Sequence, residues 1–248
     1  MATNWTDVGK EKITGVLIGI EHLPAPIKTH MRRTFQSRPA IKHVYHVTEL
    51  LYCLRKAYYR RMASENSIDD MGTWNIYRGN TFDNRWSPLF DKNQITLKSE
   101  RKNITITGTL DFVWYDEKNM EKVLYDLKMP KNVYYRKSGG AGKFYTAQVQ
   151  VYLAMAHENG ELMDVHRCRV MMVADDLVID EVPQKDEILD ILWDRAYLLD
   201  EALETKNPSK LKGPEDSAWE CREDYCPGTV EWRIACKDET ITEGYPIY

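Results

Sequence analysis

NQITLKSERKNITITGTLDFVWYDEKNMEKVLYDLKMP, residues 93–130, is the stretch that decides the expected fold of this chain. Apolar and polar residues alternate along most of it, which is the pattern of strands with one buried face. Turn-forming residues interrupt the alternation at 100–103 and again at 116–119. The stretch therefore predicts three consecutive antiparallel strands.

Two acids and a lysine lie on the second and third of these strands. Because side chains alternate along a strand, Asp126 and Lys128 share one face while Leu127 points into the opposite layer. On the preceding strand, one apolar side is formed by Leu110, Phe112 and Trp114. Asp111 lies on the other side, so strand pairing brings two carboxylates within reach of one divalent cation, beside an ammonium group that neutralises phosphate charge. The alternative is a hairpin whose solvent face carries an Asp–Lys pair.

A helix expected to end near Ala156 adds an amide and a phenol to these groups. Gln148 and Tyr152 are four residues apart and share a helical face, where they can orient the lysine or a phosphate of the cleaved strand. Gly108, three residues before Asp111, removes side-chain bulk, which we interpret as room for a phosphate backbone.

Residues 129–145, MPKNVYYRKSGGAGKFY, join the third strand to this helix and contain no acid. Cations interleaved with aromatic rings are typical of single-strand binding, because the cations meet phosphates and the rings stack on unpaired bases. The DNA contacts predicted here are Tyr134, Tyr135, Arg136, Lys137 and Lys143. A solvated loop that binds nothing is the alternative.

Helices are expected on both sides of the three strands in the sequence. Residues 47–63 have leucines at helical spacing after Thr48, a suitable N-cap, and predict one amphipathic helix. A second helix is expected over 75–90, strands over 165–174 and 177–183, and a last helix over 185–204. This order predicts an α/β fold with a mixed β-sheet flanked by helices.

Length and composition indicate one domain with an appendage. A chain of 248 residues with 43% hydrophobic residues can build one substantial core. Prolines at 24, 26 and 39 break any period, so we expect an irregular basic arm over 1–44, the core over 45–206 and a loop-like segment over 207–248. No apolar run has the length of a membrane span, and we expect a soluble, cytoplasmic protein with no membrane partner.

Charge is distributed unevenly along the chain. The formal net charge is −4, but residues 1–61 hold eleven Lys or Arg against four acids, a balance of +7, which leaves −11 for residues 62–248. A basic front and an acidic remainder are consistent with local contact with a polyanion. Scattered surface charge that segregated by chance gives the same pattern.

The five cysteines are an odd number, which fits reduced thiols better than a disulfide framework. Cys53 lies in the first expected helix, whereas three others lie near the C-terminus: Cys221, Cys226 and Cys236. Four thiolates suit zinc as well as an iron–sulfur cluster. Cys168, among the apolar residues of an expected strand, is interpreted as a buried thiol.

Three motifs in order carry a family resemblance: Gly108-x-x-Asp111, Asp126-x-Lys128 and Gln148-x-x-x-Tyr152. They resemble the PD-(D/E)xK nucleases of the RecB type, which have a restriction-endonuclease-like fold. With the cysteine segments 52–59 and 219–236, the chain is similar to the CRISPR-associated Cas-four iron–sulfur exonucleases and their stand-alone viral and archaeal relatives. The resemblance covers about residues 45 to 236.

The resemblance implies a metal-dependent DNA exonuclease. The implied ligands of Mg or Mn are Asp111, Asp126 and the carbonyl of Leu127. Lys128 would position or activate the attacking water, and Gln148 and Tyr152 would support the site and the DNA.

A cluster and a substrate are implied in the same way. The four-iron four-sulfur ligands would be Cys53, Cys221, Cys226 and Cys236, with zinc as the alternative metal. The helix around Cys53 would present Arg55, Lys56 and Arg60 to DNA, which we expect to be single-stranded or to have free ends. CRISPR adaptation or recombination proteins are the partners that the family suggests.

One position departs from the family pattern. Members carry a metal-binding histidine three residues after a glycine in the second helix, whereas here Gly79 is followed by Phe82, which cannot be a ligand. Asp83 is adjacent but about 100° away around a helix, and His43 or His46 would approach only through the fold. The sequence leaves open a nucleic-acid-binding module that has lost catalysis, or a partner-binding protein whose cysteines hold zinc.

Overall fold

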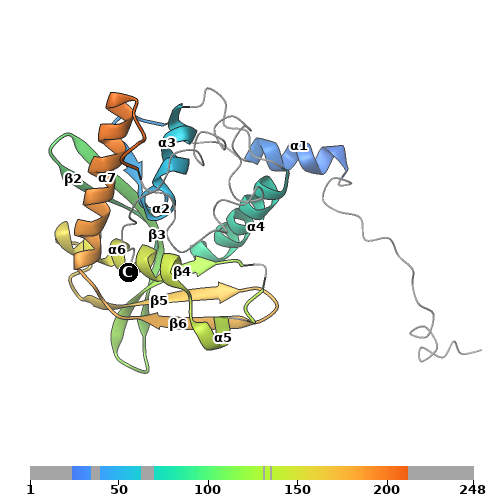
Figure 1. Ribbon diagram of the computed structural model, residues 1–248. Helices are drawn as coiled ribbons and strands as arrows, with labels where there is room; N and C mark the ends of the chain where they lie inside the picture. Colours follow the sequence, from blue (N-terminus) through green and yellow to red (C-terminus); the bar gives the residue numbers. More distant parts are fainter. Residues whose placement is uncertain (1–23, 35–39, 63–69, 131, 135, 212–248) are drawn as a thin grey trace, which may run out of the picture.

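The computed structural model describes residues 24–34, 40–62, 70–130, 132–134 and 136–211 (Figure 1). Its helices are α1 (Ala25–Thr34), α2 (Val47–Leu51), α3 (Leu54–Met62), α4 (Asp70–Trp86), the 3-10 helix η3 (Ser87–Leu89), α5 (Arg136–Gly139), α6 (Lys143–Glu158) and α7 (Glu187–Thr205). Its strands are β1 (Val44–His46), β2 (Lys92–Arg101), β3 (Ile104–Asp116), β4 (Glu121–Lys128), β5 (Val165–Val173) and β6 (Leu177–Val182). The predicted α/β class, a mixed sheet flanked by helices, is confirmed.

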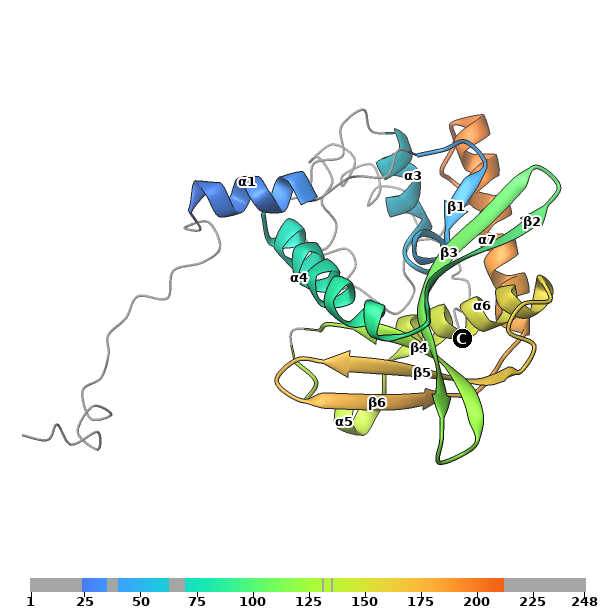
Figure 2. The same cartoon turned by 180° about the vertical axis from the view of Figure 1, so that it is seen from behind.

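The six strands form one sheet in which β3 has three partners (Figure 2). The antiparallel order β2–β3–β4 is the one that the sequence predicts, and β4 then pairs in parallel with β5, which pairs antiparallel with β6. β1 pairs in parallel with β3 over residues 105–107, whereas β4 pairs with β3 over residues 112–116. Since β2 occupies one edge of β3 along both stretches, β1 and β4 lie on its other edge and leave residues 108–111 between them.

Two apolar cores lie on the two faces of the sheet. The larger core joins β1, β3, β4 and β5 to α2, α3, α6 and α7, and it includes Leu110 and Leu124. The smaller core contains Phe112, Val123, Tyr125 and Leu127, packed against α4. Adjacent residues of β4 thus point to opposite cores, as the alternation of a strand requires.

The predicted common apolar side of Leu110, Phe112 and Trp114 is wrong. Leu110 lies in the larger core, Phe112 lies in the smaller one, and Trp114 is 48% exposed. Strand β3 therefore does not keep one apolar face along residues 110–114. Its side chains change sides close to Asp111, where its pairing with β4 ends.

The interpretation of residues 1–44 as an irregular arm is wrong for residues 25–34, which form α1. Pro26 is the second residue of this helix, where a missing N–H is tolerated because first-turn N–H groups have no intrahelical acceptor. The Pro24 carbonyl accepts N–H bonds from Ile27 at 3.0 Å and Lys28 at 3.2 Å. The helix lies beside α4, with the His30 and Tyr77 rings edge to face at 5.7 Å (Figure 1).

The single helix predicted over residues 47–63 is also wrong, because the chain breaks between α2 and α3 at Tyr52 and Cys53. Arg195 of α7 explains the break. Its Nε donates to the Leu50 carbonyl at 2.5 Å and its guanidinium donates to the Tyr52 carbonyl at 2.6 Å. These carbonyls at the end of α2 thus gain partners outside the helix. The N-cap of α2 is His46, not Thr48.

The second half of the fold follows the expected order. Helix α6 and strands β5 and β6 lie where predicted within one or two residues, and α7 covers 187–205 in place of 185–204. Cys168 is a buried strand thiol, as predicted, and burial raises its pKa to about 12. No helix in the described part of the chain has both the length and the apolar character that a membrane span requires.

Candidate functional site

The candidate site lies where β3 and β4 separate. Their register ends at Phe112 and Tyr125, so the next residues inward, Asp111 and Asp126, come from facing positions on strands that no longer share a hydrogen-bond ladder. The Asp111 carboxylate fills this opening: its Oδ2 accepts the backbone N–H of Leu127 at 2.6 Å. Asp111 is thereby fixed against β4 by a charge-assisted hydrogen bond.

Asp126 is an acid buried in this opening, with 1% of its surface exposed. Its Oδ1 faces the Gln148 amide at 3.4 Å, and its Oδ2 lies 2.6 Å from Lys128 Nζ but receives no well-directed hydrogen bond. Burial, with contributions from the charges of Asp111 and Asp83, raises the pKa of Asp126 to about 7 although Lys128 opposes the shift. A buried carboxylate oxygen without a directed donor is the kind of group that a cation satisfies.

Lys128 is the cationic member of the site. Burial alone lowers its pKa, but the carboxylates of Asp126 and Asp111 raise it by more, so the ammonium keeps its proton. The Lys128 Nζ lies 5.6 Å from the centre of the Tyr145 ring, and the Arg136 guanidinium lies 5.6 Å from the same ring. The two cations therefore lie beside one aromatic side chain, that of Tyr145.

Gln148 and Tyr152 support Asp126 from α6. The Gln148 Nε2 donates to the Tyr152 hydroxyl at 2.8 Å, and both side chains are buried. Burial, together with the charge of Asp126, raises the pKa of the Tyr152 phenol, which therefore stays neutral. A Cβ on Gly108 would lie 2.5 Å from Cε1 of Tyr152. Gly108 thus makes room for this ring, and its interpretation as room for a phosphate backbone is wrong.

Helix α4 brings Asp83 to the same site, although this residue was not assigned to it from the sequence. Burial and then the charge of Asp111 raise the pKa of Asp83 to about 6, against the opposing effect of Lys128. Phe82 points to the smaller core and packs on Trp86 with ring centres 4.6 Å apart. The polar positions 80, 83, 84 and 87 follow helical spacing, and this stripe was visible in the sequence.

The donor set is compatible with a hard cation, because Asp111, Asp126 and Asp83 offer carboxylate oxygens. In the described part of the chain, no three His, Cys, Asp or Glu side chains gather closely enough to hold a metal by themselves. His43 does not help, since its Nδ1 lies 2.7 Å from Oδ1 of Asp200 on α7. Backbone carbonyls, substrate oxygens or water would complete the coordination.

The basic segment after β4 is tied to the sheet by aspartates. Asp175 accepts the N–H of Val133 at 3.1 Å, Asp180 accepts the N–H of Ala141 at 2.6 Å, and Asp176 pairs with Lys137. Lys137 is thereby partly neutralised. The other predicted contacts in this segment are Tyr134, which is 72% exposed, Arg136, Lys143, and Tyr135, which lies outside the described residues.

The predicted DNA contact of Arg55 is wrong. Its side chain is 2% exposed, and its Nε donates to the Leu211 carbonyl at 2.6 Å. An arginine in a broken helix can turn inward because its five donors can satisfy buried carbonyls. Lys56 is half-buried and Arg60 is exposed, so both keep a side open to solvent.

Of the four cysteines assigned to a cluster, the described residues contain one. Cys53 is buried between α2 and α3, two residues before Arg55. The Arg55–Leu211 hydrogen bond places the start of the C-terminal segment against the helix that follows Cys53. Three predicted ligands lie outside the described residues: Cys221, Cys226 and Cys236.

Comparison with known proteins finds a similar fold but does not identify a function. No protein-family model and no curated protein matches the chain. Among solved structures, the chain is similar to SSO0001, with a TM-score of 0.55 and 15% identity over 81% of this chain and 89% of that one. A "Putative exonuclease" from Eubacterium rectale matches with a TM-score of 0.32 and 11% identity over 87% of this chain and 81% of that one. The likeness to SSO0001 shows a shared fold.

Proposed function

We propose that this protein is a divalent-metal-dependent deoxyribonuclease that acts on single strands or free ends. The observation that carries the proposal is the buried Asp126 carboxylate, which contacts Lys128 and shares its surroundings with Asp111 and Asp83. Three acids against one lysine leave negative charge in a poorly solvated opening. Such an arrangement is costly without a cation and becomes favourable with one.

The proposed ligands of Mg or Mn are Asp111, Asp126 and the carbonyl of Leu127. Each Asp111 oxygen already accepts one hydrogen bond, from Gln94 or from Leu127, and keeps a second lone pair for a metal. Asp83 adds a third negative charge to the same space. When bound, the metal supplies Lewis acidity and lowers the pKa of a bound water.

Lys128 is proposed to act as a fixed positive charge. Because neighbouring carboxylates raise its pKa, it is poorly suited to remove a proton from water and well suited to stabilise charge that develops on the phosphate. Gln148 and Tyr152 are positioning residues: they hold Asp126 from behind and are too buried to contact DNA broadly. By the family resemblance, the proposed products carry 5′ phosphate and 3′ hydroxyl ends.

The DNA is proposed to approach along the basic side of the opening. Arg136 and Lys128 share the Tyr145 ring, and Lys143 contacts Phe144, with its Nζ 5.5 Å from the ring centre. Such cation–ring pairs place phosphate-binding charge beside surfaces on which unpaired bases stack.

Cleavage of an end-labelled single strand in a series of Mg, Mn, Ca and EDTA tests the proposal. The wild type is compared with Asp126→Asn, which keeps the shape of the side chain, and with the control Glu117→Gln in the exposed β3–β4 turn. We expect cleavage by the wild type and the control in Mn, and none by Asp126→Asn. Equal rates for all three proteins would remove Asp126 from the mechanism.

An iron–sulfur cluster held by Cys53, Cys221, Cys226 and Cys236 is part of the proposal, with zinc as the alternative. The Arg55–Leu211 hydrogen bond supports it, because Leu211 lies beside α3, the helix that follows Cys53. Iron, sulfide and zinc analysis of anaerobically purified protein tests it. We expect about four irons and four sulfides per chain, reduced in Cys53→Ser but not in Cys168→Ser.

The second candidate function is a DNA-binding module without catalysis. Phe82 favours it, since this side chain belongs to an aromatic core and offers no ligand. Restoring histidine at position 82 would place the imidazole in that core, so we expect no gain of cleavage from Phe82→His. Tight binding of labelled single strands without cleavage in any of the metals would select this function.

A further inference from the structure

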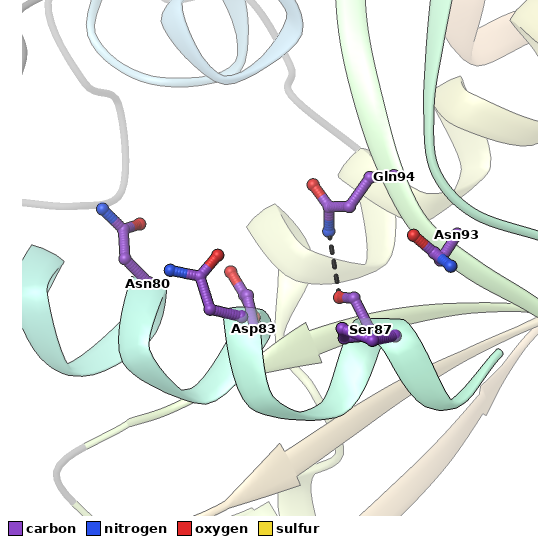
Figure 3. A pocket seen from close by; sticks show the side chains of 7 residues that line it. Asn80, Asp83, Ser87, Asn93 and Gln94 are labelled. Carbon is purple, nitrogen blue, oxygen red and sulfur yellow. Dashed lines mark hydrogen bonds between the residues drawn. The ribbon is translucent and has the colours of Figure 1, made fainter.

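A polar pocket lies between α4 and the start of β2 (Figure 3). It is next to the candidate site of Asp111, Asp126 and Lys128, which we call the acid site. Its volume is about 300 Å³, at the lower end of the range for sites that bind small molecules. It is lined by Asn80, Asp83, Asn84, Ser87, Pro88, Asn93 and Gln94. Figure 3 shows Asn80 and Asp83 on the side of α4 toward which Gln94 projects from β2.

The α4 wall of this pocket has polar groups that the protein does not use. No hydrogen bond or ion pair joins the side chains of Asn80, Asp83 or Asn84 to another residue in the described ranges. These positions are three and four residues apart, so they present their groups on one helical face. Two amides and a carboxylate therefore remain available to a ligand.

Gln94 joins the pocket to the acid site. It lies between the paired residues Asn93 and Ile95 of β2 and has a φ of +46°, which non-glycine residues seldom adopt. In this conformation its Nε2 reaches Ser87 Oγ at 3.2 Å and Asp111 Oδ1 at 3.3 Å. An unfavourable backbone angle that aims a side chain at a site is a recognised sign of a functional constraint.

The chemistry of the lining restricts what the pocket can hold. The Asp83 carboxylate repels phosphate, and the amides and hydroxyl disfavour an apolar group. A nucleobase presents adjacent donors and acceptors along one edge, and asparagine and glutamine amides pair with such edges. Single-stranded DNA is the form whose bases are free to leave the stack.

We propose that this pocket receives the base of a nucleotide that flanks the scissile phosphate, held by Asn80, Asn84 and Gln94. This proposal rests on the proposed function, because the position of the scissile phosphate is set by the neighbouring Asp111. The pocket anchors the strand through a base, so that one phosphate lies at the acid site.

An abasic scan tests the pocket. Single-stranded oligonucleotides, each with one nucleotide replaced by an abasic residue, are cut in Mn to obtain kcat and KM, and their Kd is measured in Ca. The proteins are the wild type, the double variant Asn80→Ala/Asn84→Ala, and the control Asn103→Ala in the exposed β2–β3 turn. Alanine favours a helix, so the double variant is expected to fold.

For the wild type and the control, we expect an abasic residue at one position flanking the cut to raise KM and Kd by about fivefold or more, the loss of one or two good hydrogen bonds. For the double variant, the intact strand should bind more weakly than it binds the wild type, and removal of the base should cost clearly less than in the wild type, because only Gln94 is left to hold it. If the abasic residue raises KM and Kd equally in the double variant and in the wild type, the proposed role of the pocket is wrong. It is also wrong if no position in the scan changes KM or Kd.

The two proposals fail separately. If the wild type cuts no strand in any metal, the nuclease proposal fails, and the Kd values in Ca still decide whether a base enters the pocket. If cleavage is strong and independent of the flanking bases, the pocket fails alone. Absence of any binding to single strands overturns both.

Discussion

In the metal-free protein, the ionisation of Asp126 should make the stability of the wild type depend on pH. The variant Asp126→Asn should lack this contribution. Burial raises the pKa of Asp126 from 3.8 to about 7. Because the folded pKa is higher than that of the unfolded chain, folding favours the protonated acid. The associated stability is complete below the unfolded pKa and is lost as the pH rises through the folded pKa.

The size of the effect follows from the shift. A difference of about three pKa units corresponds to about 4 kcal/mol in total, of which roughly 2 to 3 kcal/mol falls between pH 5 and pH 8. Asparagine has nearly the same shape and does not ionise. The free energy of unfolding of Asp126→Asn, minus that of the wild type, should therefore rise by this amount between the two pH values.

Urea unfolding followed by circular dichroism in EDTA, at constant ionic strength, measures this difference at each pH. Glu117→Gln serves as the control and should follow the wild type. Added Mn should stabilise the wild type more than the variant at pH 8, because only the wild type has the complete carboxylate site. A difference that stays constant within about 0.5 kcal/mol between pH 5 and pH 8 would refute the burial argument for Asp126.

Three further substitutions test the supports of the site. Gly108→Ala should destabilise the fold by roughly 1 to 3 kcal/mol, because its Cβ would meet the Tyr152 ring at 2.5 Å, whereas Gly79→Ala, with nothing within 4 Å and a helical backbone, should be neutral or stabilising in the same urea assay. Arg195→Met should cost on the order of 2 kcal/mol or more in thermal or urea unfolding, since two carbonyls at the end of α2 lose their donor; an unchanged midpoint would contradict this role. Tyr152→Phe keeps the ring but removes its hydroxyl, so kcat should fall by about tenfold or less with KM unchanged, and a loss as large as that of Asp126→Asn would make the phenol more than a support.

Local patterns predicted the strands well, because alternation and turn residues determine them over short distances. The pairing of β2, β3 and β4 follows from residues 93–130 alone. The break between α2 and α3 was not predictable in this way. It depends on Arg195, which is more than 140 residues away in sequence and becomes a neighbour only in the fold.

The sequence predicted the pair of Asp126 and Lys128 in the candidate site, but it did not predict the contribution of Asp83 beside this pair. Asp126 and Lys128 pair as strand alternation requires. Asp83 was set aside because a motif pointed to Phe82, yet the orientation of α4 turns the aromatic residue to a core and the acid to the site. Arg55 was wrongly assigned to DNA binding. Its basic side chain, in a basic helix, instead donates to the buried carbonyl of Leu211.

The branching of the sheet at β3 has a consequence for how the protein opens. This strand is joined at once to β1, β2 and β4, and residues 104, 106, 110 and 112 along it are almost completely buried. Amide protons of residues 105–107 and 112–113, which have strand partners on both edges, should therefore exchange with deuterium only through global unfolding, whereas those of α1 should exchange earlier. Fluctuations that loosen the periphery would then leave the strand on both sides of Asp111 in register, which makes the Asp111 carboxylate one of the last groups in the molecule to lose its place.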